Sequence, residues 1–275
     1  MNRTTRPIIT LTTDFGTRDS YVAEMKGVIA TIAPDARLID ITHEVTPHDV
    51  RHAGFVLHQV WSRYPEGTIH LAVVDPGVGT DRRIVLGRYA GRFVVAPDNG
   101  LVTFVHRAYA VEAMHVVEHR RFMLAHLSAT FHGRDIMAPV SAHLACGAAP
   151  RDFGRATDRI ELLTLDHRAT RRGDEITGDV LHVDHFGALI TNVGEDQLAN
   201  PPVVGGWRVI VDDQPIGPVC TTFSDVPSGE PLALIGSSGR LEIAVCRGRA
   251  VDRFGASPSI RVIGDRHGEE PVDAT

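Results

Sequence analysis

Four polar segments, each at the expected end of a strand, hold the residues that could carry chemistry: residues 13–16, 75–83, 131–135 and 236–239. In the second, a proline and two glycines set a tight backbone between the carboxylate of Asp75 and the guanidinium groups of Arg82 and Arg83. In the third, His132 stands between an apolar approach and a Gly-Arg-Asp helix start. Such residues can orient and deprotonate a nucleophile. By its residues alone, the 75–83 loop fits an ordinary structural turn equally well.

Other familiar site patterns are absent from the sequence. The glycine-rich segments match neither the GxxxxGK phosphate loop nor the GxGxxG dinucleotide fingerprint. No serine lies in a GxSxG motif. The 15 histidines include no HExxH motif, and His43-Glu44 lacks a second histidine at the required spacing, so we predict no metal site. We interpret several histidines as solvated surface residues: His48, His52, His58, His115 and His119.

Composition narrows the function further. The 28 basic residues are 27 arginines and Lys26, so a lysine Schiff base would have to use that residue. The apolar periodicity around Lys26 predicts a solvated position on a helix face. A net charge of −6 without a basic run argues against a nucleic-acid partner.

Three features bear on cellular location. No run approaches 18 apolar residues, so we expect no membrane span. The apolar stretch that follows Pro7 is too short for the core of a signal peptide. The cysteines, Cys146, Cys220 and Cys246, are odd in number, widely spaced and form no CxxC pair. We therefore expect a protein of the reducing cytoplasm.

An α/β domain in residues 1–165 must position the first three segments. Strand-like runs at residues 7–11, 37–41 and 68–74 alternate with helix-like patterns that begin near Asp19 or Ser20 and at Asp49. This order predicts a mostly parallel sheet wrapped by helices. Ligands gather at the carboxyl ends of such strands, where Asp14 and Asp75 fall. Further along, the patterns predict a hairpin over residues 84–96 and a helix over residues 135–145.

The second half of the chain is different in kind. The arginine-rich residues 166–174 are expected to be a linker. From 175 to 266, short β-rich runs are broken by glycine and proline, which predicts a small β-barrel or sandwich. The runs are residues 178–183, 188–193, 207–211, 232–235 and 241–245. Residues 267–275 are polar and expected to be a loose tail.

Taken in order, the motifs of the chain resemble those of the S-adenosylmethionine hydroxide adenosyltransferase family, which is related to the fluorinases and chlorinases. The matching segments are residues 12–16, 40–43, 74–79, 96–100, 131–135, 184–187, 190–192, 237–239 and 241–244. They span nearly the whole chain. Any one of them is a weak signal, whereas the ordered set is highly specific.

The resemblance implies an N-terminal α/β domain and a C-terminal β-barrel. It also implies a homotrimer with active sites between the N-terminal domain of one subunit and the C-terminal domain of its neighbour. The implied reaction needs no cofactor: water or hydroxide attacks the ribose 5′ carbon of S-adenosylmethionine and releases adenosine and L-methionine.

Carried over residue by residue, the resemblance makes Asp75, Arg82 and His132 the catalytic set. Asp14 would hold the ribose hydroxyls, because a carboxylate can accept two hydrogen bonds. The segments around Asp184 and Ser237 would hold the methionine ammonium and carboxylate. The full implied substrate-binding set is Asp14, Phe15, Val78, Gly133, Asp184, Phe186, Ser237 and Ser238.

Displacement at a sulfonium needs no acid, because the leaving thioether is neutral. Much of the catalytic effect is therefore expected from positioning a poorly solvated nucleophile behind the carbon, which can lower the activation free energy by up to roughly 7–11 kcal/mol. His132 is our candidate for the base that accepts the proton of water, although delivery of preformed hydroxide would use the same residues. Asp75 would orient the water or the imidazole, and Arg82 would keep Asp75 ionised.

Three alternatives stay open at this stage. The first is a 5′-halogenase of the same superfamily. The halogenating relatives carry tyrosine where this chain has Asp75, and a carboxylate repels a halide by about 4 kcal/mol at 4 Å and an effective dielectric constant near 20. The others are a non-catalytic adenosine or S-adenosylmethionine binding module and a metal-dependent hydrolase that uses the histidines. Ala188 and Cys246 stand where the family commonly has asparagine, in the region expected to meet adenine.

Overall fold

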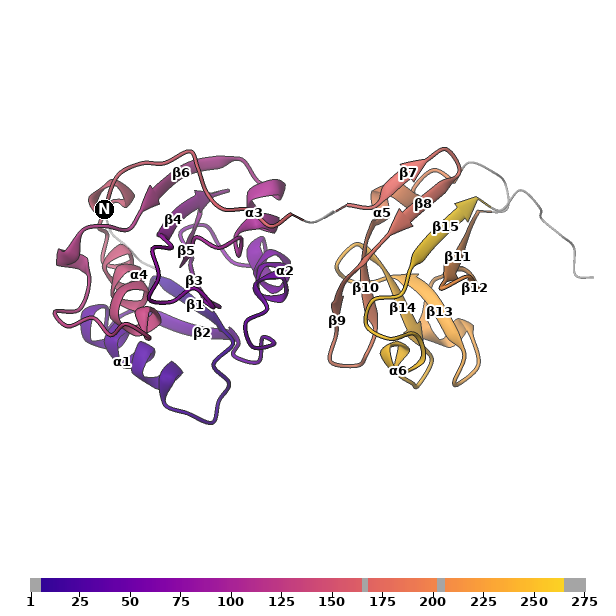
Figure 1. Ribbon diagram of the computed structural model, residues 1–275, viewed down its shortest axis with the longest axis horizontal. Coiled ribbons are helices and arrows are strands. Elements are labelled where there is room, and N and C mark those ends of the chain that lie inside the picture. Colours follow the sequence, from indigo (N-terminus) through magenta and orange to yellow (C-terminus); the bar gives the residue numbers. More distant parts are fainter. Residues whose placement is uncertain (1–5, 165–167, 202–205, 265–275) are drawn as a thin grey trace, which may run out of the picture. The chain divides into compact units, whose positions relative to one another are not determined.

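The computed structural model describes residues 6–164, 168–201 and 206–264 (Figure 1). The chain divides into two compact units, residues 1–164 and 165–275. The first is a mixed α/β unit and the second is all β apart from short helices, which confirms the predicted fold class. No helix in the described ranges has both the length and the apolar composition to cross a membrane.

A six-stranded sheet forms the centre of the first unit, in the order β2-β1-β3-β5-β4-β6. The strands β2, β1, β3 and β5 are parallel neighbours, and β4 runs antiparallel to both β5 and β6. Their bounds are β1 Ile8–Thr13, β2 Arg37–Thr42, β3 Ile69–Val73, β4 Ile84–Tyr89, β5 Arg92–Pro97 and β6 Val111–Val116. The helices are α1 Tyr21–Ile32, α2 Val50–Trp61, α3 Thr103–Ala108 and α4 Ala138–Ala145.

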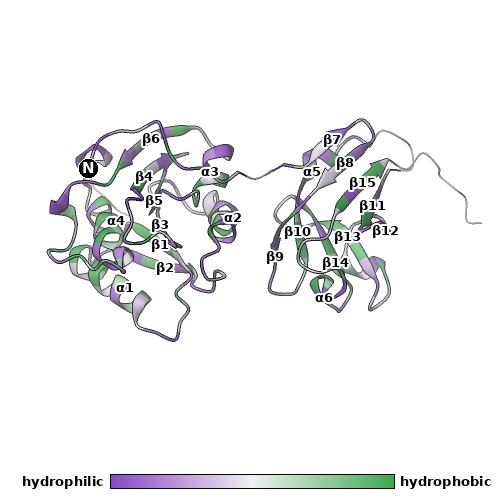
Figure 2. Ribbon diagram, viewed as in Figure 1, coloured by the Kyte–Doolittle hydropathy of each residue, from purple (hydrophilic) through white to green (hydrophobic). Residues whose placement is uncertain are grey.

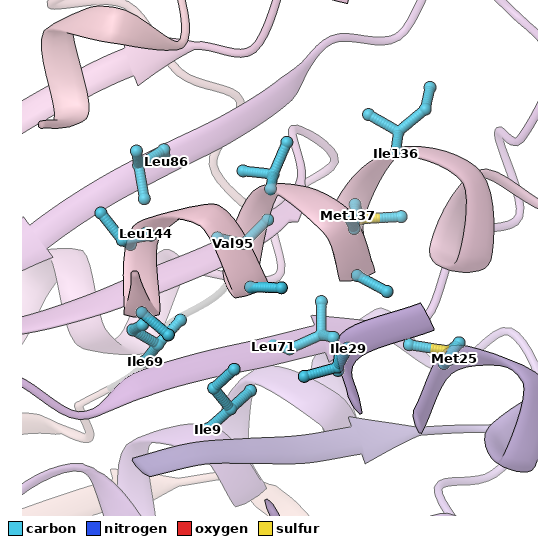
Figure 3. Packing of buried hydrophobic residues seen from close by; sticks show 14 of the residues in the cluster. Ile9, Met25, Ile29, Ile69, Leu71, Leu86, Val95, Ile136, Met137 and Leu144 are labelled. Atoms are coloured by element: carbon cyan, nitrogen blue, oxygen red, sulfur yellow. The ribbon is translucent and has the colours of Figure 1, made fainter. Parts of the chain in front are cut away.

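Helices cover both faces of this sheet because its strands carry apolar residues on both sides. Leu71 of β3 packs in the same buried cluster as Met25 of α1 and Met137 beside α4 (Figure 3). The next residue, Ala72, joins the opposite cluster with Leu57 and Trp61 of α2. Successive side chains of a strand point to opposite faces, so this near-continuous apolar run is the signature of a strand buried on both sides.

A single nine-stranded sheet makes up the second unit, in the order β7-β8-β15-β11-β12-β13-β14-β10-β9. All described pairings are antiparallel except β12 with β13. The strands are β7 Thr170–Arg172, β8 Glu175–Gly178, β9 Val180–Val183, β10 Leu189–Gly194, β11 Trp207–Val211, β12 Gln214–Cys220, β13 Pro231–Ile235, β14 Arg240–Val245 and β15 Ile260–Gly264. The short helices are α5 Glu195–Leu198 and α6 Ala250–Phe254.

The second sheet curls into a half-barrel. The side chain of Asn192, in β10, accepts a hydrogen bond of 2.8 Å from the backbone N–H of Asp179, the residue directly after β8. This bond joins two strands that are far apart in the strand order. Curling encloses a core of residues from nearly every strand, among them Val209, Ile243 and Val262. In Figure 2 these central strands are hydrophobic, whereas β7 at the sheet edge is hydrophilic.

Several local predictions need correction. Residues 170–172, in the expected linker, form β7, because Thr170–Arg172 pairs antiparallel with β8. The run at 178–183 is split between β8 and β9, since the backbone of Asp179 bonds to Asn192 instead of continuing a ladder. The predicted helix over 135–145 begins earlier, as a π-helical turn at Gly133–Met137. The loose tail predicted for 267–275 lies outside the described residues.

Candidate active site

A pocket of about 300 Å³ lies in the first unit at the carboxyl ends of β1 and β3. The chain leaves β1 through Asp14 and Phe15, and it leaves β3 through Asp75. Parallel neighbouring strands bring these loops to one edge of the sheet, as the sequence predicts. The lining residues are Asp14, Phe15, Tyr21, Pro47, His48, Val73, Asp75, Val78, Thr130, Phe131, His132 and Gly133.

Asp75, Arg82 and His132 are joined by hydrogen bonds beside this pocket. The Nε atom of Arg82 lies 2.8 and 2.9 Å from the two carboxylate oxygens of Asp75, and its Nη2 also donates to Asp75 Oδ2. The same Nη2 lies 3.0 Å from His132 Nδ1. The side chains of Arg82 and Asp75 are only 10% and 6% exposed, so little water competes for this ion pair.

The 75–83 loop reaches this geometry through tight turns. The N–H of Val78 donates to Asp75 O, and Thr80 donates through both its N–H and its hydroxyl to Gly77 O. Gly79 has φ +81°, and a Cβ there would lie 2.6 Å from the carbonyl oxygen of Ala129. Only glycine fits this position, so the loop is pressed against the segment that leads to His132.

The hydrogen bond from Arg82 determines which nitrogen of His132 carries its proton. Arginine is permanently charged and has no acceptor, so its Nη2 must donate and His132 Nδ1 must accept. The neutral imidazole therefore carries its proton on Nε2. Burial lowers the pKa of His132 from its ordinary value of 6.5, Arg82 lowers it further, and the carboxylates of Asp75 and Asp135 offset part of the change.

A buried carboxylate anchors the turn that follows His132. Asp135 is fully buried, accepts a hydrogen bond from the backbone N–H of Ser128 at 2.6 Å and pairs with Arg134 Nε at 2.6 Å. Arg134 also reaches Glu24 of α1 at 2.8 Å and lies over the ring of Phe131. These contacts hold the loop and the π-helical turn that place His132 and Gly133 at the pocket.

Asp14 lines the same pocket from a different loop. Its Oδ2 accepts a hydrogen bond of 2.9 Å from the backbone N–H of His48, which has φ +67°. Next to it, the rings of Phe15, Tyr21 and Phe131 contact one another with centroids 5.3–5.8 Å apart. This side of the pocket therefore combines one carboxylate with an aromatic surface suited to a flat ring or an apolar chain.

The structure brings together seven sequence-predicted residues of the first unit: Asp14, Phe15, Asp75, Val78, Arg82, His132 and Gly133. Six lining residues were not predicted as site residues from the sequence: Tyr21, Pro47, His48, Val73, Thr130 and Phe131. His48 is exposed, as we expected, but its backbone holds Asp14. The sequence does carry a signal for this role. His48 lies two residues before α2 begins at Val50, and a helix that follows a parallel strand begins at the same sheet edge at which that strand ends.

The other predicted binding residues lie in the second unit. Asp184 Oδ1 accepts a hydrogen bond of 2.7 Å from the N–H of Ala188, which closes the loop that leaves Phe186 76% exposed. Ser237 and Ser238 lie in the β13–β14 turn, and Ser238 Oγ is buried without a hydrogen-bond partner among the described residues. Glu242, which we did not predict, has its pKa raised by burial and by the charge of Asp184.

The two residues that depart from the family pattern lie together. Ala188 and Cys246 are both buried in one small apolar cluster with Leu232, Leu234 and Ala244. Neither adds a polar group to the second unit, apart from a thiol. Within the described residues, no three His, Cys, Asp or Glu side chains gather closely enough to hold a metal ion.

Comparison with known proteins gives a consistent result over most of the chain. Residues 9–154 match the model for the SAM hydroxide adenosyltransferase N-terminal domain, and residues 178–263 match the model for the C-terminal domain of the same family. An (R)-S-adenosyl-L-methionine hydrolase from Salinispora tropica is 42% identical, over 93% of this chain and 97% of its own length. A fluorinase from Actinoplanes sp. is 30% identical over 86% and 90%. A crystal structure of an uncharacterized conserved protein from Thermotoga maritima superposes with a TM-score of 0.86 at 36% identity, over 93% of this chain and 99% of that one.

Proposed function

The chain belongs to the SAM hydroxide adenosyltransferase family, and from this premise we propose that it is an S-adenosyl-L-methionine hydrolase. Water attacks the ribose 5′ carbon, the bond from that carbon to sulfur breaks with its electron pair going to sulfur, and adenosine and L-methionine leave. The observation that carries the proposal is the Asp75–Arg82–His132 set, joined by hydrogen bonds at the pocket edge.

We propose roles for these three residues in which Asp75 and His132 exchange the functions expected from the sequence. Because Arg82 occupies His132 Nδ1, the remaining Nε2–H of His132 is a donor, which suits it to hold the oxygen of the attacking water. The proton of that water then passes to the carboxylate of Asp75, which lines the pocket. Arg82 fixes the direction of the Asp75 carboxylate through its paired hydrogen bonds. His132 thus orients the nucleophile instead of acting as the base.

Substrate binding is proposed to use both units. Asp14 has one oxygen on the His48 N–H and its second oxygen for the ribose hydroxyls. Phe15, Val78 and Gly133 give apolar contact in the pocket. From the second unit, Asp184 and the serine pair Ser237–238 hold the methionine ammonium and carboxylate, and Phe186 packs against the adenosine. Ser238 Oγ is buried and has no hydrogen-bond partner in the part of the chain that the structure describes, which supports a binding role for the serine turn.

A direct assay tests the proposed activity. We expect pure protein incubated with S-adenosylmethionine and a chelator to form adenosine and methionine, with ¹⁸O from labelled water in the adenosine 5′ hydroxyl. No adenosine above the buffer blank would refute the hydrolase. Saturable binding without turnover would indicate a binding module instead. Activity lost on chelation and restored by zinc would indicate a metal-dependent enzyme, and 5′-chloroadenosine in chloride buffer would indicate a halogenase.

We also propose that the active form is a homotrimer whose subunits complete one another's sites. The proposed substrate contacts are divided between two separate compact units, and side chains meant for substrate, such as Phe186, are exposed in the single chain. Light scattering should therefore give three times the chain mass of 29.9 kDa. A fully active monomer at assay concentration would disprove this assembly.

The ionisation of His132 predicts the acid limb of activity. Protonation at Nδ1 would turn an N–H towards the Arg82 N–H and break the hydrogen bond, so only neutral His132 is competent. Since burial and Arg82 lower the pKa of His132, the neutral form persists to lower pH than for free imidazole. We expect the acid limb of kcat/KM to be centred below pH 6.5, the ordinary pKa of histidine. An acid limb centred above pH 6.5 would contradict this assignment.

A further inference from the structure

The proposed activity makes no use of a row of polar side chains that connects β1, β2 and α1 and is buried at the β1 end. Thr13 Oγ1 lies 2.9 Å from His43 Nδ1, and His43 Nε2 lies 3.1 Å from Asp40 Oδ1. On its other oxygen, Asp40 accepts a hydrogen bond of 2.6 Å from Lys26 Nζ. The single lysine of the protein, which we expected to be solvated, is therefore half-buried and paired.

The direction of each hydrogen bond follows from its neighbours. The backbone N–H of Phe15 donates to Thr13 Oγ1 at 3.3 Å. A carboxylate can only accept a hydrogen bond, so the 3.1 Å contact with Asp40 favours a proton on His43 Nε2. In that tautomer Nδ1 is an acceptor, and the Thr13 hydroxyl donates to it.

These polar side chains lie where the loop after β1 is joined to the loop after β2, and both loops lead to the pocket. The N–H of Gly16 donates to His43 O at 2.8 Å, and the N–H of Val45 donates to Thr13 O at 3.3 Å. The register between β1 and β2 shifts at Leu11/Thr12, just before this junction. A bulge of this kind redirects the side chains that follow it. The two loops thus meet at Thr13 and His43, one residue before Asp14 and five residues before His48.

The burial of this junction makes its hydrogen bonds consequential. Thr13 is 0% exposed and His43 is 6% exposed, so water does not replace a partner that is lost. Burial raises the pKa of Asp40, but hydrogen bonds from Lys26 and His43 outweigh it and leave that pKa lowered, so Asp40 remains a charged anchor for the imidazole.

We propose that His43, anchored by Asp40 and Lys26, is a positioning residue for the substrate ribose. It holds Thr13 and the adjoining loop, and thereby sets the direction of the Asp14 carboxylate; this inference rests on the proposed function. The order Thr–His–Asp resembles a nucleophilic triad. Thr13, however, has no exposed surface and does not line the pocket, so it cannot attack a substrate.

The test removes the Thr13 hydroxyl with little change of shape. We expect Thr13→Val to raise KM for S-adenosylmethionine about tenfold, the value of roughly one hydrogen bond, with little change in kcat. Thr13→Ser keeps the hydroxyl and should restore KM. The matched control is Thr10→Val on the same strand, because Thr10 makes an equally buried bond of 2.8 Å to His70 away from the pocket. It should lower the melting temperature and leave KM unchanged.

Product inhibition identifies the part of the substrate that is affected. Thr13→Val should weaken inhibition by adenosine about tenfold, as expected for one lost hydrogen bond, and leave inhibition by 2′,3′-dideoxyadenosine unchanged. Wild-type KM in Thr13→Val, or equal weakening for both nucleosides, would overturn the positioning role. Failure of the proposed function is distinguishable: wild-type protein would then form no adenosine, while calorimetric binding of the two nucleosides would still report on Thr13 and His43.

Discussion

Replacing Asp75 by asparagine should lower kcat roughly 10³-fold, within the range that proton transfer by a positioned side chain contributes. Asparagine keeps the size of the side chain and one acceptor oxygen for Arg82, but it cannot take a proton from water. The lost interaction belongs to the transition state, so kcat and kcat/KM should fall together while KM changes little. Adenosine release measured by chromatography under saturating substrate gives the result.

The matched control for this substitution lies in the same loop. Asp81→Asn also removes one carboxylate, but Asp81 is exposed and does not line the pocket, so its kcat should match that of wild type. If Asp75→Asn kept activity close to that of Asp81→Asn, Asp75 would not be the proton acceptor. Recovery of the lost activity at high pH would instead show that the enzyme uses hydroxide taken from solution.

Replacing Arg82 by methionine should affect both activity and stability. Asp75, only 6% exposed, would lose its cationic partner, and an uncompensated buried charge typically costs about 3–5 kcal/mol of unfolding free energy. His132 would also lose the donor at Nδ1 and with it the preference for a proton on Nε2. We expect a lower melting temperature and loss of nearly all adenosine formation, even well below that temperature.

The Arg83→Met variant separates the loss of stability from the loss of activity. Arg83 is the neighbour of Arg82 in sequence and pairs with Asp98, a carboxylate that is more deeply buried than Asp75 but does not line the pocket. Its loss should lower the melting temperature and leave kcat of the folded protein intact. Equal kcat in the two variants at a temperature where both are folded would remove Arg82 from the catalytic set.

Much of the first unit could be predicted because its signals are local. The predicted cap Asp49 accepts a hydrogen bond from the N–H of His52 at the start of α2. The runs that predict β1, β2 and β3 alternate with helix periodicity, and the hairpin of β4 and β5 follows from two apolar runs around a short turn. By contrast, β7 is exposed and arginine-rich, so its sequence carries no burial pattern, and pairing with β8 alone makes it a strand.

The sequence by itself determined the family, the fold class and the identity of the three candidate catalytic side chains, because ordered motifs and periodicity are properties of the linear chain. Only the tertiary structure decided which hydrogen bonds those side chains make. The bond from Arg82 to His132 spans 50 residues and assigns a tautomer, and the bond from Thr13 to His43 spans 30 residues. A proton's position depends on which donor or acceptor lies within about 3 Å, and that distance is set by strand order and loop packing.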